Sequence, residues 1–441
     1  MRIAAIGFTA CAALALTAPP AAAPSVDAAG HVAPAAAFAA SCASVRDPLF
    51  GTVRIDGTRV LARIRRRTLR PRAVPRVPLP RHVYGWNWDF SPACDAVALA
   101  ERRGRILLVD LERGRRIGFV NVGTRSAAGQ IAWPRPDRLI AFAGPYRSPH
   151  LVTISVPDGR VVATRRVGGN PGFSEATSLG MAVVVGPIDG IGAATLVLAT
   201  PDGGMLRVPV PEIRAGLDRG DPRRQLGRQL TPGLAVDEAA GRAYVVAANE
   251  PLVAEVDLAS GVVAYHQLRG AGGTAGSPMA AKGLVYGAYR TAGWVGDGTI
   301  AVAGEVTRTR RDWRRAERRG QLATRIDPHG LQLIRTADWT VTTLNPLLRW
   351  FTRTGDVLLG MDSIPVSRAD SKATGLVAYG TDGRRLFTRF RGDGRAGLRG
   401  ASWPYAYVTA RRPRRTYVID LRTGRTANVI RSTSPPILLV R

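Results

Sequence analysis

The sequence has few of the residues from which catalytic and metal sites are usually built. It contains five histidines, and His82, His150, His266 and His329 show no metal-ligand spacing. No Gly-x-Ser-x-Gly motif for a nucleophilic serine is present. The glycine-rich stretch 168–172 lacks the Lys-Ser/Thr ending of a phosphate-binding loop. We therefore predict no catalytic residues, no metal site and no cofactor.

Lysine and acidic residues are scarce as well. The chain has 62 basic and 33 acidic residues, and Lys282 and Lys372 are its lysines, which leaves a net charge of +29 carried by arginine. A GC-rich coding bias accounts for arginine in place of lysine, but not for the excess of basic over acidic residues. A charge of this size attracts polyanions such as phosphate polymers, anionic lipid head groups or nucleic acid.

Long apolar runs are missing beyond the N-terminus, where Arg2 precedes the apolar run Ile3–Leu16 and Ala21–Ala23 offers a small-residue cleavage site. The run is too short to span a bilayer and is typical of a secretory signal. We expect a signal peptide at 1–23 and a disordered Ala/Pro-rich leader at 24–41. The mature chain is then exported, either secreted or associated with the cell envelope, without a transmembrane anchor.

Cysteine is rare, with three in the chain. Cys11 lies within the signal, and Phe8-Thr9-Ala10 before it is a poor lipobox, which disfavours a lipoprotein. The other two, Cys42 and Cys94, suggest one disulfide in an exported protein. This bridge would tie the N-terminal segment to the first repeat and contribute roughly 4 kcal/mol of stability. Two buried free thiols are the alternative.

Tight turns that contain glycine recur between apolar strands. They are Arg113-Gly114, Asp158-Gly159, Asp202-Gly203, Ser260-Gly261, His329-Gly330, Asp382-Gly383 and Thr423-Gly424. The glycines are 45, 44, 58, 69, 53 and 41 residues apart, a spacing typical of one propeller blade per repeat. An apolar run suited to a second strand buried on both faces lies in each repeat, at 96–100, 139–143, 181–185, 243–247, 299–303, 357–361 and 405–409.

This pattern predicts an all-β chain, with a seven-bladed β-propeller at 84–441 and an N-terminal extension. A hairpin signal at Asp56-Gly57 lies within the segment 42–83. It indicates half of an eighth blade, an outer strand pair or a cap, and we favour a hairpin cap. The apolar strand at 437–440 has no partner in the pattern and is a candidate for closing the ring.

Two stretches resemble known propeller families. Phe90-Ser91-Pro92, followed by the runs 96–100 and 106–110 and by Gly114, resembles the repeat of TolB-type propellers. Residues 231–245, with Thr-Pro-Gly-Leu-Ala-Val-Asp and Gly-Arg-Ala-Tyr-Val, are similar to YVTN-type surface propellers. The resemblance covers most of the repeats as a pattern. It implies a fold and no activity, because such propellers include envelope binding proteins, lactonases and quinoprotein dehydrogenases.

Loop lengths predict a binding face. In a four-stranded meander, the turns between strands one and two and between three and four lie at one end. The connections from two to three and from four to the next blade lie at the other end. The long connections are of the second kind, at 186–194, 211–231, 269–281, 305–320 and 362–374. Within them, 211–230 and 307–322 are helical candidates. Long loops on a rigid scaffold usually carry binding residues.

Arginine gathers in these connections. One group around Trp313 contains Arg308, Arg310, Arg311, Arg314 and Arg315, and another contains Arg411, Arg412 and Arg414. Guanidinium groups bind phosphate or carboxylate through two hydrogen bonds, and an embedded tryptophan can stack on a base or a sugar. The alternative is a solvated basic insertion. In its favour, Arg113, Arg115, Arg116, Arg384 and Arg385 place charge on the opposite face.

Two functions follow from these observations. The first is an exported, non-catalytic propeller that binds an envelope protein or an anionic polymer through its loop-rich face. A specific nucleic-acid partner is not expected, because the chain is exported. The second is a secreted metal-dependent lactonase or hydrolase with a site in the central channel. Its candidate metal ligands are Glu175, Asp237, Glu250 and Asp297.

Overall fold

The computed structural model describes the chain from residue 49 to residue 439 with internal gaps. The gaps are 81–82, 102–103, 123–129, 145–147, 157, 219–227, 271–284, 310–323, 363–373, 393–395, 412–413 and 432–436. The predicted signal peptide, the leader and Cys42 lie outside the described residues, so export and the Cys42–Cys94 bridge stay predictions. In the described part of the chain, no helix is long and apolar enough to cross a membrane.

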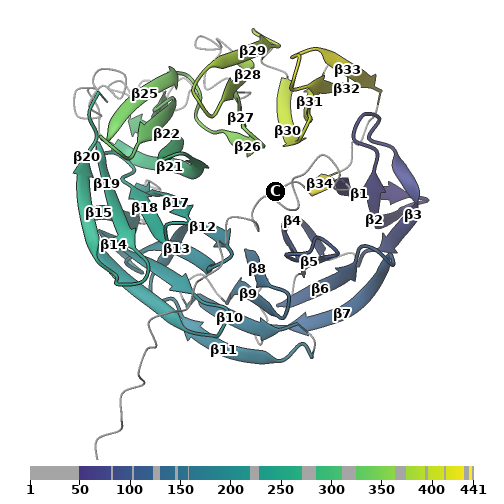
Figure 1. Cartoon of the computed structure of the whole chain (residues 1–441), viewed down its shortest axis with the longest axis horizontal. Coiled ribbons are helices and arrows are strands. Elements are labelled where there is room, and N and C mark those ends of the chain that lie inside the picture. The colour runs from purple at the N-terminus through teal and green to yellow at the C-terminus, as the bar shows by residue number, and fades with distance from the viewer. Residues whose placement is uncertain are drawn as a thin grey trace, which may run out of the picture. The chain divides into compact units, whose positions relative to one another are not determined.

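The described residues form an all-β fold with a β-propeller arrangement (Figure 1). Six of their sheets have four strands each, in the orders β34-β1-β2-β3, β4–β7, β8–β11, β17–β20, β26–β29 and β30–β33. These strands are β1 (Leu49–Ile55), β2 (Thr58–Ile64), β3 (Pro71–Pro78), β4 (Val83–Phe90), β5 (Ala96–Glu101), β6 (Arg105–Asp110), β7 (Arg115–Asn121), β8 (Ile131–Arg135), β9 (Arg138–Ala143), β10 (His150–Ser155), β11 (Val161–Arg166), β17 (Gly233–Asp237), β18 (Arg242–Val246), β19 (Leu252–Asp257), β20 (Val263–Gln267), β26 (Thr352–Thr354), β27 (Val357–Asp362), β28 (Gly375–Gly380), β29 (Arg385–Arg389), β30 (Ala396–Ser402), β31 (Tyr405–Arg411), β32 (Arg414–Asp420), β33 (Thr426–Ile430) and β34 (Ile437–Leu439).

Two further meanders share one ten-stranded sheet. Its strands are β12 (Asn170–Thr177), β13 (Gly180–Gly186), β14 (Gly190–Ala199), β15 (Met205–Asp218), β16 (Arg228–Thr231), β21 (Val285–Gly296), β22 (Thr299–Thr309), β23 (Thr324–Pro328), β24 (Leu331–Arg335) and β25 (Thr340–Asn345). β16 pairs antiparallel with β15 and parallel with β21, and so joins the two meanders. The predicted seven blades are therefore not found, since six separate four-stranded sheets stand beside this fused one.

The ring closes through the two ends of the described chain. β34 pairs with β1, with Thr52 opposite Ile437 and Phe50 opposite Leu439. Figure 1 shows β34 on the inner side of β1, so the C-terminal strand is the innermost strand of this sheet. Residues 49–78 are thus part of a four-stranded sheet like the others, and the predicted cap is wrong. The prediction that the strand near residue 437 closes the ring is confirmed.

Apolar side chains are buried between successive meanders and not in one central core. Ile106 of β6 and Leu139 of β9 belong to one such cluster. Tyr407 of β31 and Val60 of β2 belong to another, which joins the last meander to the first. Among the described residues these clusters follow one another around the whole circle. Each fully buried Leu or Ile contributes about 1.5–3 kcal/mol, and the stability of the ring therefore depends on contact between sheets.

The predicted second strands are confirmed as β5, β9, β13, β18, β22, β27 and β31. β5 and β13 are buried along their whole length, because neighbouring sheets cover both faces. Aspartates stabilise the tight turns between third and fourth strands. Asp257, for example, accepts a hydrogen bond of 2.7 Å from the Ser260 N–H. This hydrogen bond holds the pKa of Asp257 below its ordinary value.

Two local predictions are wrong. The described part of segment 211–230 is not helical, because β15 continues to Asp218 and β16 begins at Arg228. Of the segment 307–322, residues 307–309 belong to β22 and the rest lies outside the described residues. His329-Gly330 is not a turn between third and fourth strands, because β23 is an extra strand inserted before β24. His329 is buried, and its Nε2 donates to the Ala248 carbonyl at 3.0 Å.

A candidate ligand pocket on the loop-rich face

β14, β15 and β22 are longer than most strands and extend toward one face of the propeller. β14 and β15 are joined by a short turn at 200–204, and their far ends pair Gly190 with Leu217. β22 likewise extends past its meander, and β23 pairs with the extension. These extensions lie at the end where second strands connect to third strands and fourth strands connect to the next meander. The prediction that long connections gather on one face is therefore supported where the chain is described.

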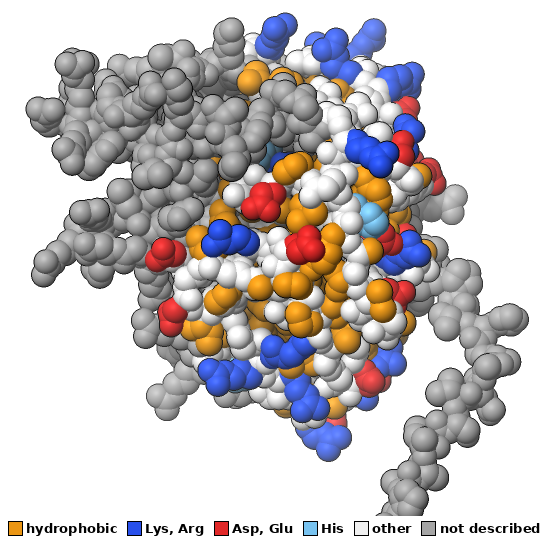
Figure 2. Space-filling view, turned by 90° about the vertical axis from the view of Figure 1, so that its left-hand side faces the viewer, with side chains coloured by type: hydrophobic (Ala, Val, Ile, Leu, Met, Phe, Trp, Pro, Cys, Tyr) orange, Lys and Arg blue, Asp and Glu red, His pale blue; other side chains and the backbone are white. Residues whose placement is uncertain are grey.

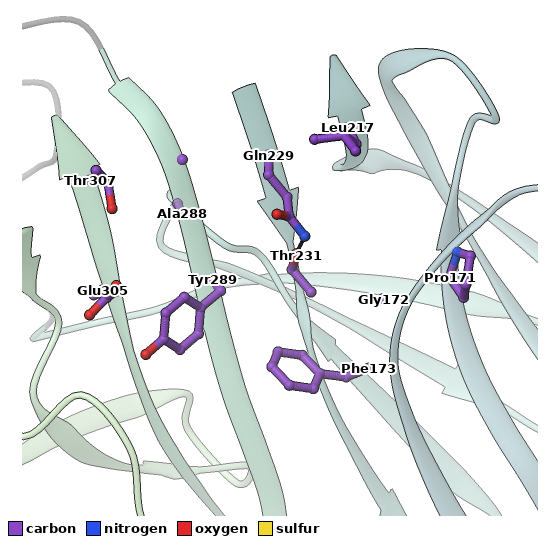
Figure 3. Close-up of a pocket in the computed structure, with 11 residues that line it drawn as sticks. Pro171, Gly172, Phe173, Leu217, Gln229, Thr231, Ala288, Tyr289, Glu305 and Thr307 are labelled. Atoms are coloured by element: carbon purple, nitrogen blue, oxygen red, sulfur yellow. Dashed lines mark hydrogen bonds between the residues drawn. The ribbon is translucent and has the colours of Figure 1, made fainter. Parts of the chain in front are cut away.

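A cavity of about 580 Å³ opens between these extensions. It is lined by Pro171, Gly172 and Phe173 of β12, Leu217 of β15, Gln229 and Thr231 of β16, Gly287, Ala288 and Tyr289 of β21, and Glu305 and Thr307 of β22 (Figure 3). Its volume is within the usual range of small-molecule sites. We call this cavity the β16 pocket, because β16 forms its back wall between β12 and β21.

In Figure 3 the ring of Phe173 reaches from β12 to below Thr231, and the ring of Tyr289 projects from β21 on the side of Glu305. Gln229 Nε2 donates a hydrogen bond of 3.2 Å to the Thr231 hydroxyl. Gly172 allows β12 to approach this wall, since a Cβ there would lie 3.2 Å from the Thr231 methyl. The pocket therefore combines two aromatic walls with an amide and hydroxyl groups.

Among the described residues that line the β16 pocket, Glu305 is the one with a charged side chain, and it forms an ion pair with Arg349. Arg349 Nη1 lies 2.9 Å from Glu305 Oε2, and both side chains are nearly buried, at 7% and 13% exposed. Removing one member of an ion pair in such surroundings destabilises the fold, because the charge that remains is poorly solvated. The carboxylate of Glu305 therefore brings little net charge to the pocket.

Replacing Arg349 by methionine should lower the free energy of unfolding by about 3–5 kcal/mol, because it leaves the Glu305 carboxylate without its cation. Urea unfolding of the two proteins measures the difference. Arg335→Met is the matched control, since its pair with Asp338 spans 3.9 Å at an exposed site and should change stability by less than about 1 kcal/mol. Equal stability of Arg349→Met and the unaltered chain would contradict the role assigned to this pair.

A small second cavity adjoins the β16 pocket and shares Pro171, Gly172, Gln229 and Thr231 with it. Asn170 also lines it, is 6% exposed, and has its Oδ1 buried without a hydrogen-bond partner among the described residues. A buried acceptor of this kind usually meets a water molecule or a ligand donor. The small cavity therefore extends the polar part of the pocket.

The arginines predicted as binding residues are described only in part. Arg308 lies on β22 opposite Arg325 of β23, and Arg411 of β31 lies opposite Arg414 of β32. Both pairs are at the loop-rich end of their strands. Residues outside the described part are Arg310, Arg311, Trp313, Arg314, Arg315 and Arg412. The structure thus gives the backbone positions of Arg308, Arg411 and Arg414, and the binding role of all these arginines stays a prediction.

The acidic residues predicted as alternative metal ligands are not brought together. Asp237 ends β17 and Asp297 lies in the turn between β21 and β22, whereas Glu250 lies in a connection at the other end. Glu175 lies on β12. Among the described residues, no three His, Cys, Asp or Glu side chains lie close enough to hold a metal ion. The four predicted ligands therefore do not form one site.

Glu175 nevertheless has an unusual environment. Its Oε2 is buried without a hydrogen-bond partner in the described structure, while the Val236 N–H donates to its carboxyl group. Burial, together with the nearby charge of Glu238, raises the pKa of Glu175 to about 8. Glu238 itself accepts a hydrogen bond of 2.9 Å from the Ser178 N–H. Glu175 is therefore protonated at neutral pH.

The rim of the ring carries mixed charge. On the side drawn in Figure 2, basic and acidic side chains are interspersed among apolar ones over the coloured surface. On this side the acidic Glu255 of β19 binds Arg242 at 2.6 Å and His266 at 3.1 Å. His266 also stacks on Trp339 with ring centroids 3.8 Å apart. These contacts join two neighbouring meanders, which gives the histidine a structural role.

No protein-family model matches the chain, and no curated protein matches its sequence. Among solved structures, it is similar to the dihydro-heme d1 dehydrogenase NirN in complex with DHE, with a TM-score of 0.54 and 14% identity over 88% of this chain and 74% of that one. The β-propeller domain of Myceliophteria thermophila Cps50 (Swd1) matches with a TM-score of 0.39 and 10% identity over 88% of this chain and 99% of that one. The likeness to the first of these structures supports a β-propeller fold, while the resemblance to TolB-type and YVTN-type propellers stays a prediction.

Proposed function

We propose that this chain is an exported, non-catalytic binding protein that holds an anionic polymer of the cell envelope on its loop-rich face. One observation carries the proposal: arginines stand opposite each other in register at that face. In the backbone register, position 308 of β22 lies opposite position 325 of β23, and position 411 of β31 lies opposite position 414 of β32, and all four residues are arginines. Like charges directly opposite each other destabilise a sheet. An anion bound between them removes that repulsion and gains charge-assisted hydrogen bonds.

The opposite face offers less attraction to anions, which supports the choice of face. Three of its arginines stand beside aspartates of the tight turns. Arg422 lies 2.8 Å from Asp420, Arg113 lies 3.6 Å from Asp110, and Arg160 lies 3.7 Å from Asp158. These exposed pairs contribute little to stability, but they lower the net positive potential around the turns. With a net charge of +29, the excess of positive charge is then left to other parts of the surface.

Long-chain polyphosphate is a suitable probe for this function. Binding to the mature chain should weaken steeply as salt rises, because the contacts are ionic. Replacing Arg308, Arg310, Arg311, Arg314 and Arg315 together by glutamate should weaken binding at low salt by more than about tenfold, measured by titration calorimetry.

The matched control reverses five arginines of the opposite face, namely Arg113, Arg115, Arg116, Arg384 and Arg385. It changes the net charge by the same amount and should leave most of the affinity. If both sets of substitutions weaken binding equally, the attraction is a general effect of net charge, and the assignment to the loop-rich face is wrong. Binding that does not respond to salt would contradict the proposal as well.

A further inference from the structure

We propose that the β16 pocket binds a neutral saccharide unit. This site goes beyond the proposed polymer binding, because the described residues that line it include no arginine. Its lining residues all come from described strand positions of β12, β15, β16, β21 and β22. Either site can therefore fail experimentally without the other.

Charge is the first argument for a neutral ligand. Glu305 is the charged side chain among the lining residues, and its carboxylate is already paired with Arg349 at 2.9 Å. Among the described lining residues, an anionic ligand would meet this carboxylate and no cation to balance it. A cationic ligand would compete with Arg349, which is 7% exposed and held in place. A neutral ligand avoids both costs.

The arrangement of aromatic and polar groups is the second argument. Phe173 of β12 and Tyr289 of β21 contribute aromatic rings to the lining, beside the polar residues of β16 (Figure 3). Gln229, Thr231, Thr307 and Glu305 add an amide, two hydroxyls and a carboxylate. A flat apolar molecule would leave these polar groups desolvated and unpaired. A saccharide has apolar C–H faces for the rings and hydroxyl groups at its edge for the polar side chains.

The small cavity at Asn170 is the third argument. It continues from the polar wall, and the buried Oδ1 of Asn170 has no hydrogen-bond partner among the described residues. A hydroxyl group, either of the ligand or of a water molecule that bridges to it, supplies the missing donor. A buried acceptor next to a pocket that already holds hydroxyl and amide groups fits a ligand with several hydroxyls.

The test is titration of the mature chain with a panel of neutral disaccharides, namely maltose, cellobiose, lactose and trehalose, at millimolar concentrations. Glucuronic acid and glucosamine serve as charged comparators, and saturation-transfer NMR reports the binding. Phe173→Ala and Tyr289→Ala should each weaken binding of the neutral saccharide by about tenfold, since each removes one aromatic wall. Thr231→Val keeps the side-chain volume and should weaken binding through the lost hydroxyl alone.

Phe119→Ala is the matched control, because Phe119 is an aromatic residue of β7, 41% exposed and far from the lining strands. It should leave saccharide binding unchanged. The proposal is overturned if no neutral disaccharide binds, if a charged comparator binds more tightly, or if Thr231→Val binds as well as the unaltered chain. Replacing Arg308, Arg310, Arg311, Arg314 and Arg315 by glutamate should leave saccharide binding intact. This result would separate the saccharide site from polymer binding.

Discussion

Removing residues 437–441 is expected to lower the free energy of unfolding by about 4 kcal/mol. The deletion removes β34, which pairs with β1 over the residues Phe50 to Thr52. It also removes Leu439, which is 2% exposed and packs in the cluster of Phe50 and Leu61. A buried leucine lost from a core costs about 2–5 kcal/mol, and each lost backbone hydrogen bond about 1 kcal/mol. Urea unfolding measures the change.

Deleting residues 440–441 alone is the control, because it leaves β34 in place and should not alter stability. A second comparison is Leu439→Ala, which keeps the strand pairing and removes most of the buried side chain. It should reproduce roughly half of the loss. If the chain without β34 unfolds at the same urea concentration as the intact chain, the ring does not depend on closure by its C-terminus.

Glu175→Gln is expected to stabilise the protein at pH 8 by about 3–5 kcal/mol and to have little effect at pH 4. Burial raises the pKa of Glu175 to about 8 in the folded chain, above its ordinary value of 4.5. Below pH 4.5 the carboxyl is protonated in both states and costs nothing. As pH rises from 4.5 to 8, the unfolded chain gains stability by ionising, at about 1.4 kcal/mol for each pH unit. The folded chain therefore loses stability over this interval.

The measurement is the free energy of unfolding in urea between pH 4 and pH 8. The difference between Glu175→Gln and the unaltered chain should grow with pH, and then level off above pH 8. Glu212→Gln replaces an exposed glutamate of β15 and should show no such trend. A difference that is constant with pH would mean that Glu175 ionises normally in the folded chain.

Local patterns in the sequence predict most of the strands. Apolar runs such as 96–100 and 181–185 are strands because their side chains meet neighbouring sheets on both faces. The turn chemistry is local as well, since the carboxylate of an aspartate near a glycine accepts a hydrogen bond from a backbone N–H two or three residues later. The sheet of β1, β2 and β3 could not be completed in this way. Its fourth strand comes from the other end of the chain, and nothing near Asp56-Gly57 reports that pairing.

The pocket was not predicted, for a related reason. Phe173 and Tyr289 lie in strands whose alternation resembles that of core strands, and the residues that bring them together belong to β16. β16 follows a segment that resembles a polar insertion, and its parallel pairing with β21 joins strands far apart in sequence. Loop lengths still predicted the face toward which β14, β15 and β22 extend. Strands of a meander alternate in direction, so the order of the strands fixes which connections lie at the same end. Which side chains meet across neighbouring strands depends on the register, and the sequence alone does not specify it.

The fused ten-stranded sheet affects how the repeats of the protein unfold. In most repeat proteins each unit is coupled only to its immediate neighbours, and units can unfold nearly independently. Here β16 hydrogen-bonds to β15 on one side and β21 on the other, while β17 contacts both β12 and β21. Three consecutive repeats are therefore coupled beyond nearest neighbours. Amide hydrogens from residue 170 to residue 345 should exchange as one cooperative block, with slower exchange than in the flanking repeats.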